Sequence, residues 1–235
     1  MSYYFDPTGI NWLFVIIEIA IAFSVIAIVF ITYEFLHLET WQVRKIGHIL
    51  INGVLALTPY FFENFFDIVV TVLILFVIVG ILSLLPKVQL LQKLIKYATR
   101  TNEKPIMLLI NVLITASVIL VLFILFYNRI YVYTAAILTL SVADGLGELI
   151  GRPYGKIQYK IFAKKSLEGS LGVFFGAIFS LTITIAINHL FEPEALWKIL
   201  VLSILVTVTE SFSFRFFDNI TIPCVTAGIM LLLFP

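Results

Sequence analysis

The residues best suited to chemistry lie between positions 144 and 170. Asp144 and Glu148 stand four residues apart, and Arg152 and Lys156 continue at the same spacing. On a helix, this spacing would place all four side chains on one face. Carboxylates bind Mg²⁺, whereas cationic side chains and bare backbone N–H groups bind phosphate oxygens. The pattern therefore predicts a site for a divalent cation and a polyphosphate.

Glycines accompany these charges, and a second polar motif follows them. Ser166 is a predicted N-cap for the next helix, whose N-terminus could hold phosphate oxygens. The glycine spacing from 151 to 156 is one residue too short for a Walker loop. Two alternatives stay open: the glycines serve close helix packing, and the acids form a satisfied ion pair with Arg152. The second motif reads Lys164, Lys165, Ser166, Leu167, Glu168, Gly169 and Ser170.

The composition places this site in a membrane protein. Of 235 residues, 61% are hydrophobic and 12% are charged, and the mean hydropathy is +1.10. Soluble domains are about 45 to 50% apolar and about 25% charged. The net charge of +1 gives no reason to expect nucleic acid as a partner. The lone Cys224 excludes an intramolecular disulfide and a cysteine-cluster metal site.

Eight apolar segments approach the length of about 20 residues that spans a bilayer. The segment near 46–61 contains His48 and Asn52, and the segment near 130–150 ends in Asp144 and Glu148. The predicted fold class is therefore all-α, a polytopic transmembrane bundle of about eight spans. The remaining segments lie at about 10–32, 68–86, 105–127, 169–190, 195–214 and 219–235.

Basic residues predict the orientation of these spans. Short cytoplasmic loops carry an excess of Lys and Arg. Of the 15 lysines and arginines, all except Arg129 and Lys198 fall in alternate loops on one predicted side. Both termini are therefore predicted to lie on the non-cytoplasmic side, with the segment 144–170 at the cytoplasmic face.

The chain is predicted to form a single integral membrane domain, residues 1–235, because it contains no repeat and no soluble region. Its active-site loop is predicted at about 144–170. A basic amphipathic stretch at about 87–100 is predicted to form a cytoplasmic interfacial helix. That helix would anchor the protein to anionic headgroups or shape the access route of a lipid substrate.

Several motifs resemble the superfamily of dolichol kinase, phytol kinase and CTP-dependent diacylglycerol kinase, the polyprenol kinase family. The central match is Asp144-Gly145, Gly151-Arg152, Gly155-Lys156 and the run KSLEGS from 165 to 170. The segment RKIGH at 44–48 is similar to the R-K-x-x-H element of the family, although basic anchors and a packed histidine would also explain it. Glu210, Asp218-Asn219 and Pro223 resemble the late E…DN…P element, although Asp218-Asn219 could be a simple turn. The late signature of CDP-diacylglycerol synthases is missing, which disfavours a cytidylyltransferase.

The resemblance implies a CTP-dependent lipid kinase that uses Mg²⁺. The acceptor would be the terminal hydroxyl of a long-chain isoprenoid alcohol, of the dolichol/polyprenol or phytol/geranylgeraniol type. Asp144 and Glu148 would bind Mg²⁺, and Glu168, Glu210 or Asp218 would orient the attacking hydroxyl. The residues expected to contact the nucleotide are Arg44, Lys45, His48, Gly145, Gly151, Arg152, Gly155, Lys156, Lys164, Lys165, Ser166, Gly169, Ser170 and Asn219.

Two other functions fit the sequence. A CTP-dependent diacylglycerol kinase would differ only in an apolar lipid pocket that no motif marks. A membrane transporter with a cation site would carry polar groups spread across the bilayer, whereas most charges here lie toward one face. The expected partners are a lipid alcohol, a nucleoside triphosphate and the bilayer, with homo-oligomers left open. The expected location is the plasma membrane of a prokaryote or the endoplasmic reticulum of a eukaryote.

Overall fold

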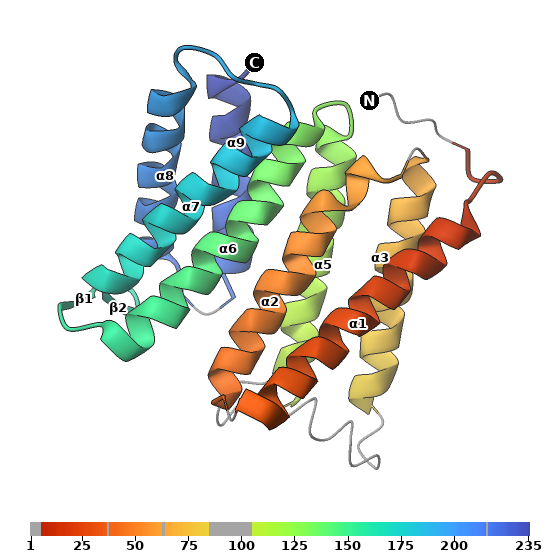
Figure 1. Cartoon of the computed structure of the whole chain (residues 1–235), viewed down its shortest axis with the longest axis horizontal. Helices are drawn as coiled ribbons and strands as arrows, with labels where there is room; N and C mark the ends of the chain where they lie inside the picture. Colours follow the sequence, from red (N-terminus) through yellow and green to blue (C-terminus); the bar gives the residue numbers. More distant parts are fainter. Residues whose placement is uncertain (1–5, 37, 63, 85–104, 215) are drawn as a thin grey trace. The chain divides into compact units, whose positions relative to one another are not determined.

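A computed structural model of the chain describes residues 6–36, 38–62, 64–84, 105–214 and 216–235 (Figure 1). These residues are mostly helical and form eight α-helices, which agrees with the predicted helical character. The chain divides into two compact units, Met1–Leu120 and Val121–Pro235. The prediction of a single domain is not tested by this division, and it stays a prediction.

A helix occupies each apolar segment that the sequence predicts to be helical. By length and composition, and within the described residues, α1, α6, α7 and α8 could each cross a membrane. This supports a membrane protein, whereas the eight-span topology and the side of the termini remain predictions. The helix predicted at 87–100 lies outside the described residues. The helices are α1 (Trp12–Leu36), α2 (Thr40–Leu57), α3 (Phe65–Leu84), α5 (Pro105–Phe126), α6 (Ile130–Tyr154), α7 (Leu167–Ile187), α8 (Ala195–Phe212) and α9 (Asp218–Leu233).

In the first unit, α1 packs against both α2 and α3. A short 3₁₀ turn, η1 (Thr58–Tyr60), follows α2. Helix α2 begins at Thr40, ahead of the predicted segment, and the Gln42 side chain accepts a hydrogen bond from the Glu39 backbone N–H at 2.9 Å. Such a bond satisfies one of the backbone donors that a helix start leaves unpaired. The polar residues between 40 and 45 therefore belong to the helix rather than to a loop.

In the second unit, α6 packs against α7 and α9, and α8 packs against α7 and α9. The side chains of α6 between Ile130 and Gly145 are almost all buried, so this helix forms the centre of the unit. Helices α6 and α8 end, and α7 and α9 begin, at the end of the unit that carries the two short strands (Figure 1). Two helix N-termini and two C-termini therefore meet at one end.

A small β-hairpin joins α6 to α7, and the sequence did not predict it. Its strands are β1 (Gln158–Lys160) and β2 (Lys164–Ser166), paired antiparallel with Tyr159 opposite Lys165 and Lys160 opposite Lys164. The Leu167 N–H donates to the Ile157 carbonyl at 2.9 Å, which extends the pairing to the first residue of α7. The predicted active-site loop is therefore a helix end, a hairpin and a helix start.

Candidate active site

Helix α6 carries three of the four charged residues that the sequence analysis aligned on one face. Asp144 is buried, with 7% of its surface exposed. Arg152 lies 3.7 Å from Glu148, one helical turn away. Lys156 is not on the helix, because Pro153 lies in the last turn and α6 ends at Tyr154 with Gly155 in extended backbone. The expected alignment of four residues is therefore correct for three and wrong for Lys156.

Glycines bring the backbones of α6 and α7 into direct contact. A Cβ on Gly172 would lie 2.8 Å from the Leu146 carbonyl oxygen, and a Cβ on Gly176 would lie 2.8 Å from the Ala143 Cα. Both distances are shorter than van der Waals contact, so no larger residue fits without movement of a helix. Glycine at 172 and 176 thus lets the two helix backbones touch.

Ser166 caps α7 in the middle of this contact, as the sequence predicts. Its Oγ accepts from the Gly169 N–H at 3.1 Å and donates to the Gly151 carbonyl at 3.3 Å. A Cβ on Gly155 would lie 2.6 Å from the same Oγ. The close approach of α7 to the end of α6 accounts for the small residues at 151, 155 and 169. Their predicted contact with a nucleotide stays a prediction.

The hairpin is attached to α8 and α7 through a cross-strand pair of side chains. Lys165 forms a salt bridge with Glu210 near the end of α8. The Tyr159 hydroxyl lies 2.8 Å from Ser211 Oγ and 2.6 Å from Ser170 Oγ. Tyr159 and Lys165 are directly opposite in the hairpin, so their side chains share one face. The sequence did not predict Tyr159, because three-residue strands are too short to show an alternating pattern. Nor did it predict Ser211 of α8, because its partner Tyr159 lies 52 residues away.

Two further acids lie at helix N-termini of this end. Glu168, in the first turn of α7, accepts from the Ile157 backbone N–H at 3.3 Å, and the charge of Lys156 acts on the same carboxylate. Asp218 is the first residue of α9, where its carboxylate accepts from the Asn219 N–H at 2.9 Å. Acids at helix N-termini are favoured by the helix dipole. Both positions therefore have a local structural reason as well as a predicted catalytic one.

Asp144 lies deeper between α6 and α7 than the other charged residues of α6. Gly151 contacts α7 at its first turn, whereas Ala143 contacts α7 at Gly176. At about 1.5 Å per residue, Asp144 is therefore about 10 Å further into the helix pair than Gly151. An acid at such a depth in a helix that can span a membrane is expected to have a functional role.

No protein-family model, curated protein or solved structure matches this chain. The resemblance to the polyprenol kinase family therefore rests on the motifs in the sequence alone.

The acids of α6 suit Mg²⁺ only in combination with phosphate. Within the described residues, no group of three or more His, Cys, Asp and Glu side chains is placed to hold a metal ion. Mg²⁺ in phosphoryl-transfer sites is commonly held by one or two carboxylates together with substrate phosphates. Asp144 and Glu148, one turn apart on α6, fit that arrangement.

The predicted nucleotide contacts at 44–48 belong to α2 in the first unit. Lys45 is buried, with 4% of its surface exposed, and Arg44 is half-buried. The Asn52 amide donates to the His48 carbonyl at 2.9 Å and lies 3.2 Å from His48 Nδ1. This contact gives His48 a structural partner within α2. Its predicted role toward a nucleotide stays a prediction.

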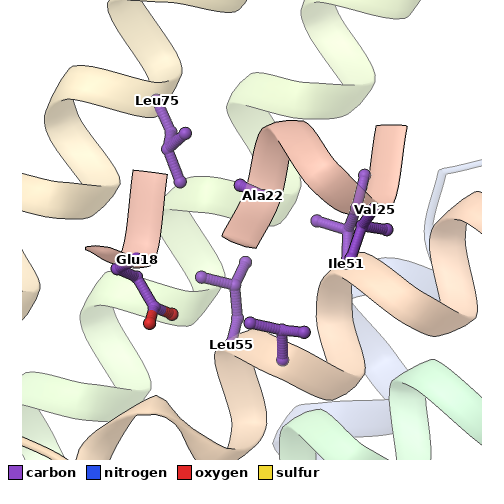
Figure 2. A pocket seen from close by; sticks show the side chains of 7 residues that line it. Glu18, Ala22, Val25, Ile51, Leu55 and Leu75 are labelled. Carbon is purple, nitrogen blue, oxygen red and sulfur yellow. The ribbon is translucent and has the colours of Figure 1, made fainter. Parts of the chain in front are cut away.

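The first unit also contains a buried acid that the sequence analysis left unassigned. Glu18, with 5% of its surface exposed, accepts a hydrogen bond from the Thr58 hydroxyl. It lines a small cavity between α1, α2 and α3, shown in Figure 2. The other lining residues are all apolar: Ala22, Val25, Ile51, Val54, Leu55 and Leu75. Glu34, also unassigned before, lies exposed near the end of α1.

Proposed function

We propose that this protein is a membrane-embedded lipid kinase that transfers the γ-phosphoryl group of CTP to a long-chain isoprenoid alcohol. The observation that carries the proposal is the meeting of acids, cations and helix N-termini at one end of the second unit. Lys165 with Glu210, and Glu168 beside Lys156, belong to four different segments of that end. Phosphoryl transfer depends mostly on positioning and on charge stabilisation, which such a cluster supplies.

In this proposal, Asp144 and Glu148 would hold Mg²⁺, which when bound would supply charge neutralisation for the transferred phosphoryl group. Arg152 is half exposed and lies one turn beyond Glu148, so its guanidinium can bind a phosphate while it remains near the acid. Lys156 is exposed at the same end and can reach the same phosphates. The backbone N–H groups at the start of α7 favour the same negatively charged ligand.

The acceptor alcohol would approach from the bilayer, because the cluster lies at the end of helices that can span a membrane. Its hydroxyl would then meet the phosphates beside Glu168, Glu210 or Asp218. Lys165 holds Glu210 in place, whereas Glu168 is held by the backbone of Ile157. One of these three acids would orient the hydroxyl for attack. The tail would stay in the bilayer, so it needs no polar recognition.

The direct test is phosphoryl transfer by the purified protein with Mg²⁺, with CTP or ATP labelled at the γ position. The lipid panel contains dolichol, polyprenol, phytol, geranylgeraniol and diacylglycerol. We expect a labelled isoprenyl monophosphate made from CTP. A product only from diacylglycerol would move the protein to the diacylglycerol kinases, and release of pyrophosphate with a CDP-lipid would identify a cytidylyltransferase.

The Asp144→Asn variant tests the metal-binding role. We expect a loss of turnover of at least about a hundredfold, because one carboxylate ligand of the ion is removed. Glu192→Gln is the matched control, since Glu192 pairs with Lys198 in the connection between α7 and α8. Equal loss in both variants, or full activity of Asp144→Asn, would contradict the assignment.

A transporter is the second candidate, and Glu18 favours it. This acid lines an apolar cavity of the first unit, and none of the residues that line this cavity is proposed for catalysis (Figure 2). Buried acids of membrane helices often mark ion pathways. Proteoliposomes that show no phosphoryl transfer but show a cation flux lost in Glu18→Gln would establish this function instead.

A further inference from the structure

Four phenylalanines form an exposed aromatic cluster beside the proposed active site: Phe162, Phe212, Phe214 and Phe217. The Phe162 ring lies 6.3 Å from the Phe212 ring and 6.2 Å from the Phe214 ring, and the rings of Phe214 and Phe217 are 4.8 Å apart. Phe162 is 65% exposed, and the other three rings are between 43% and 51% exposed. A cluster that joins the hairpin turn to the end of α8 therefore leaves much of its apolar surface uncovered.

The aromatic cluster continues an apolar stripe of α8. Leu200, Ile204, Val208 and Phe212 follow one another at intervals of four residues, and all of them are exposed. Helix α8 is long and apolar enough to cross a membrane, so an exposed apolar stripe along it suits contact with lipid. The stripe ends at Phe212, where the hairpin turn contacts it. The cluster thus lies where such a helix meets the headgroups, a region in which aromatic side chains are favoured.

Two lysines flank the aromatic turn. Lys160 and Lys164 are directly opposite in the hairpin, and both are exposed. Like charges in a cross-strand pair repel each other, so the pair is stabilised by an anion between or beside them. An apolar turn with a lysine on either side is complementary to an anionic lipid surface, in which phosphates lie above hydrocarbon.

The hairpin is held firmly enough to present this turn in one orientation. Tyr159 contacts Ser170 and Ser211, and Lys165 contacts Glu210, from the middle positions of the two strands. These contacts fix the base of the hairpin on α7 and α8. The exposed rings and lysines are therefore a fixed surface of the second unit.

We propose that the hairpin turn binds the membrane surface. The aromatic cluster inserts among the lipids of one leaflet, and Lys160 and Lys164 bind the phosphates of anionic headgroups. This function does not depend on the proposed kinase activity, because the surface would serve any reaction or transport step at this end. For a lipid-modifying enzyme, it would also hold the cluster of catalytic residues at headgroup level.

The test uses the full-length protein in liposomes, with a fluorescent probe on the hairpin turn. Phe162→Cys in a Cys224→Ser background is labelled with the environment-sensitive dye NBD. Gln158→Cys, at the other end of the same hairpin, is the matched control. The liposomes contain phosphatidylcholine, with or without phosphatidylglycerol, and spin-labelled lipids of either headgroup act as quenchers.

The probe at 162 is expected to be quenched strongly by spin-labelled lipid and weakly by aqueous iodide, with the opposite order at 158. Spin-labelled phosphatidylglycerol should quench the probe at 162 better than spin-labelled phosphatidylcholine, with an enrichment of about fivefold around the two lysines. Lys160→Gln with Lys164→Gln should abolish this preference, whereas Lys160→Arg with Lys164→Arg should retain it.

Equal quenching of the probes at 162 and 158 by iodide would overturn the proposal. Equal quenching of the probe at 162 by spin-labelled phosphatidylglycerol and spin-labelled phosphatidylcholine would also overturn it. Shielding from iodide without any quenching by lipid would show that another protein copy covers the turn. Each variant is first compared with the parent by gel filtration and thermal unfolding, so that loss of folding is recognised.

Discussion

Replacement of Gly176 by alanine tests whether α6 and α7 are packed as closely as the structure describes. The new Cβ would lie 2.8 Å from the Ala143 Cα, 3.1 Å from the Val142 carbonyl oxygen and 3.2 Å from the Ala143 N. All three atoms belong to backbone, so no side chain can rotate away. The helices must separate by several tenths of an ångström along their shared contact.

The size of the effect follows from two opposing terms. Overpacking of a tight contact costs about 1 to 3 kcal/mol. Alanine is a better helix former than glycine by about 1 kcal/mol, which offsets part of that cost. We therefore expect Gly176→Ala to lower the free energy of unfolding by up to about 2 kcal/mol.

Gly228 of α9 supplies the matched control. Among the described residues, no atom outside the adjacent backbone of α9 lies within 4 Å of the position that its Cβ would occupy. Gly228→Ala should therefore raise the free energy of unfolding by up to about 1 kcal/mol, through helix propensity alone. Both variants are unfolded in mixed micelles with increasing denaturing detergent, and the transitions are followed by circular dichroism. Equal stability of the two variants would refute the close packing of α6 on α7.

Two further predictions concern the attachment of the hairpin. Lys165→Met and Glu210→Gln should each lower the free energy of unfolding by about 3 kcal/mol, because each removes one partner of a largely buried salt bridge. The double variant should lose less than the sum of the two, and additive losses in a double-mutant cycle would argue against the salt bridge. Tyr159→Phe should lower the free energy of unfolding by about 1 to 2 kcal/mol and speed amide hydrogen exchange in β1 and β2, because Ser170 and Ser211 lose their shared hydrogen-bond partner. Unchanged hydrogen exchange would show that the hairpin is held by other contacts.

The helices could be predicted because the sequence marks them with long apolar runs. Their ends were less predictable where polar residues belong to the helix. Helix α2 begins six residues before its predicted segment, and a helix start at Glu39 and Gln42 is a local signal that hydrophobicity does not contain. The end of α6 was missed for a related reason. Pro153 and Gly155 end the helix before Lys156, although the charge spacing continues through it.

The candidate site was predicted in part. The capping role of Ser166 follows from its type and from the helix after it, and the structure confirms it. The pairing of Lys165 with Glu210 joins positions 45 residues apart, so no local pattern predicts it. The same holds for Glu18 and Thr58, which meet across 40 residues of sequence. Tertiary contacts of this kind decide which polar residues act together, and they are visible only in the fold.

The close packing around Ser166 limits which substitutions this chain can accept during evolution. Three glycines, at 151, 155 and 169, approach one hydroxyl, and a Cβ on any of them would lie between 2.6 and 3.1 Å from it. A single replacement at one of these positions is therefore harmful until a second change makes room. Neutral evolution would have to pass through a less stable intermediate. The serine and the three glycines should therefore be conserved together. Deep mutational scanning should find them intolerant singly and rescued, if at all, only in pairs.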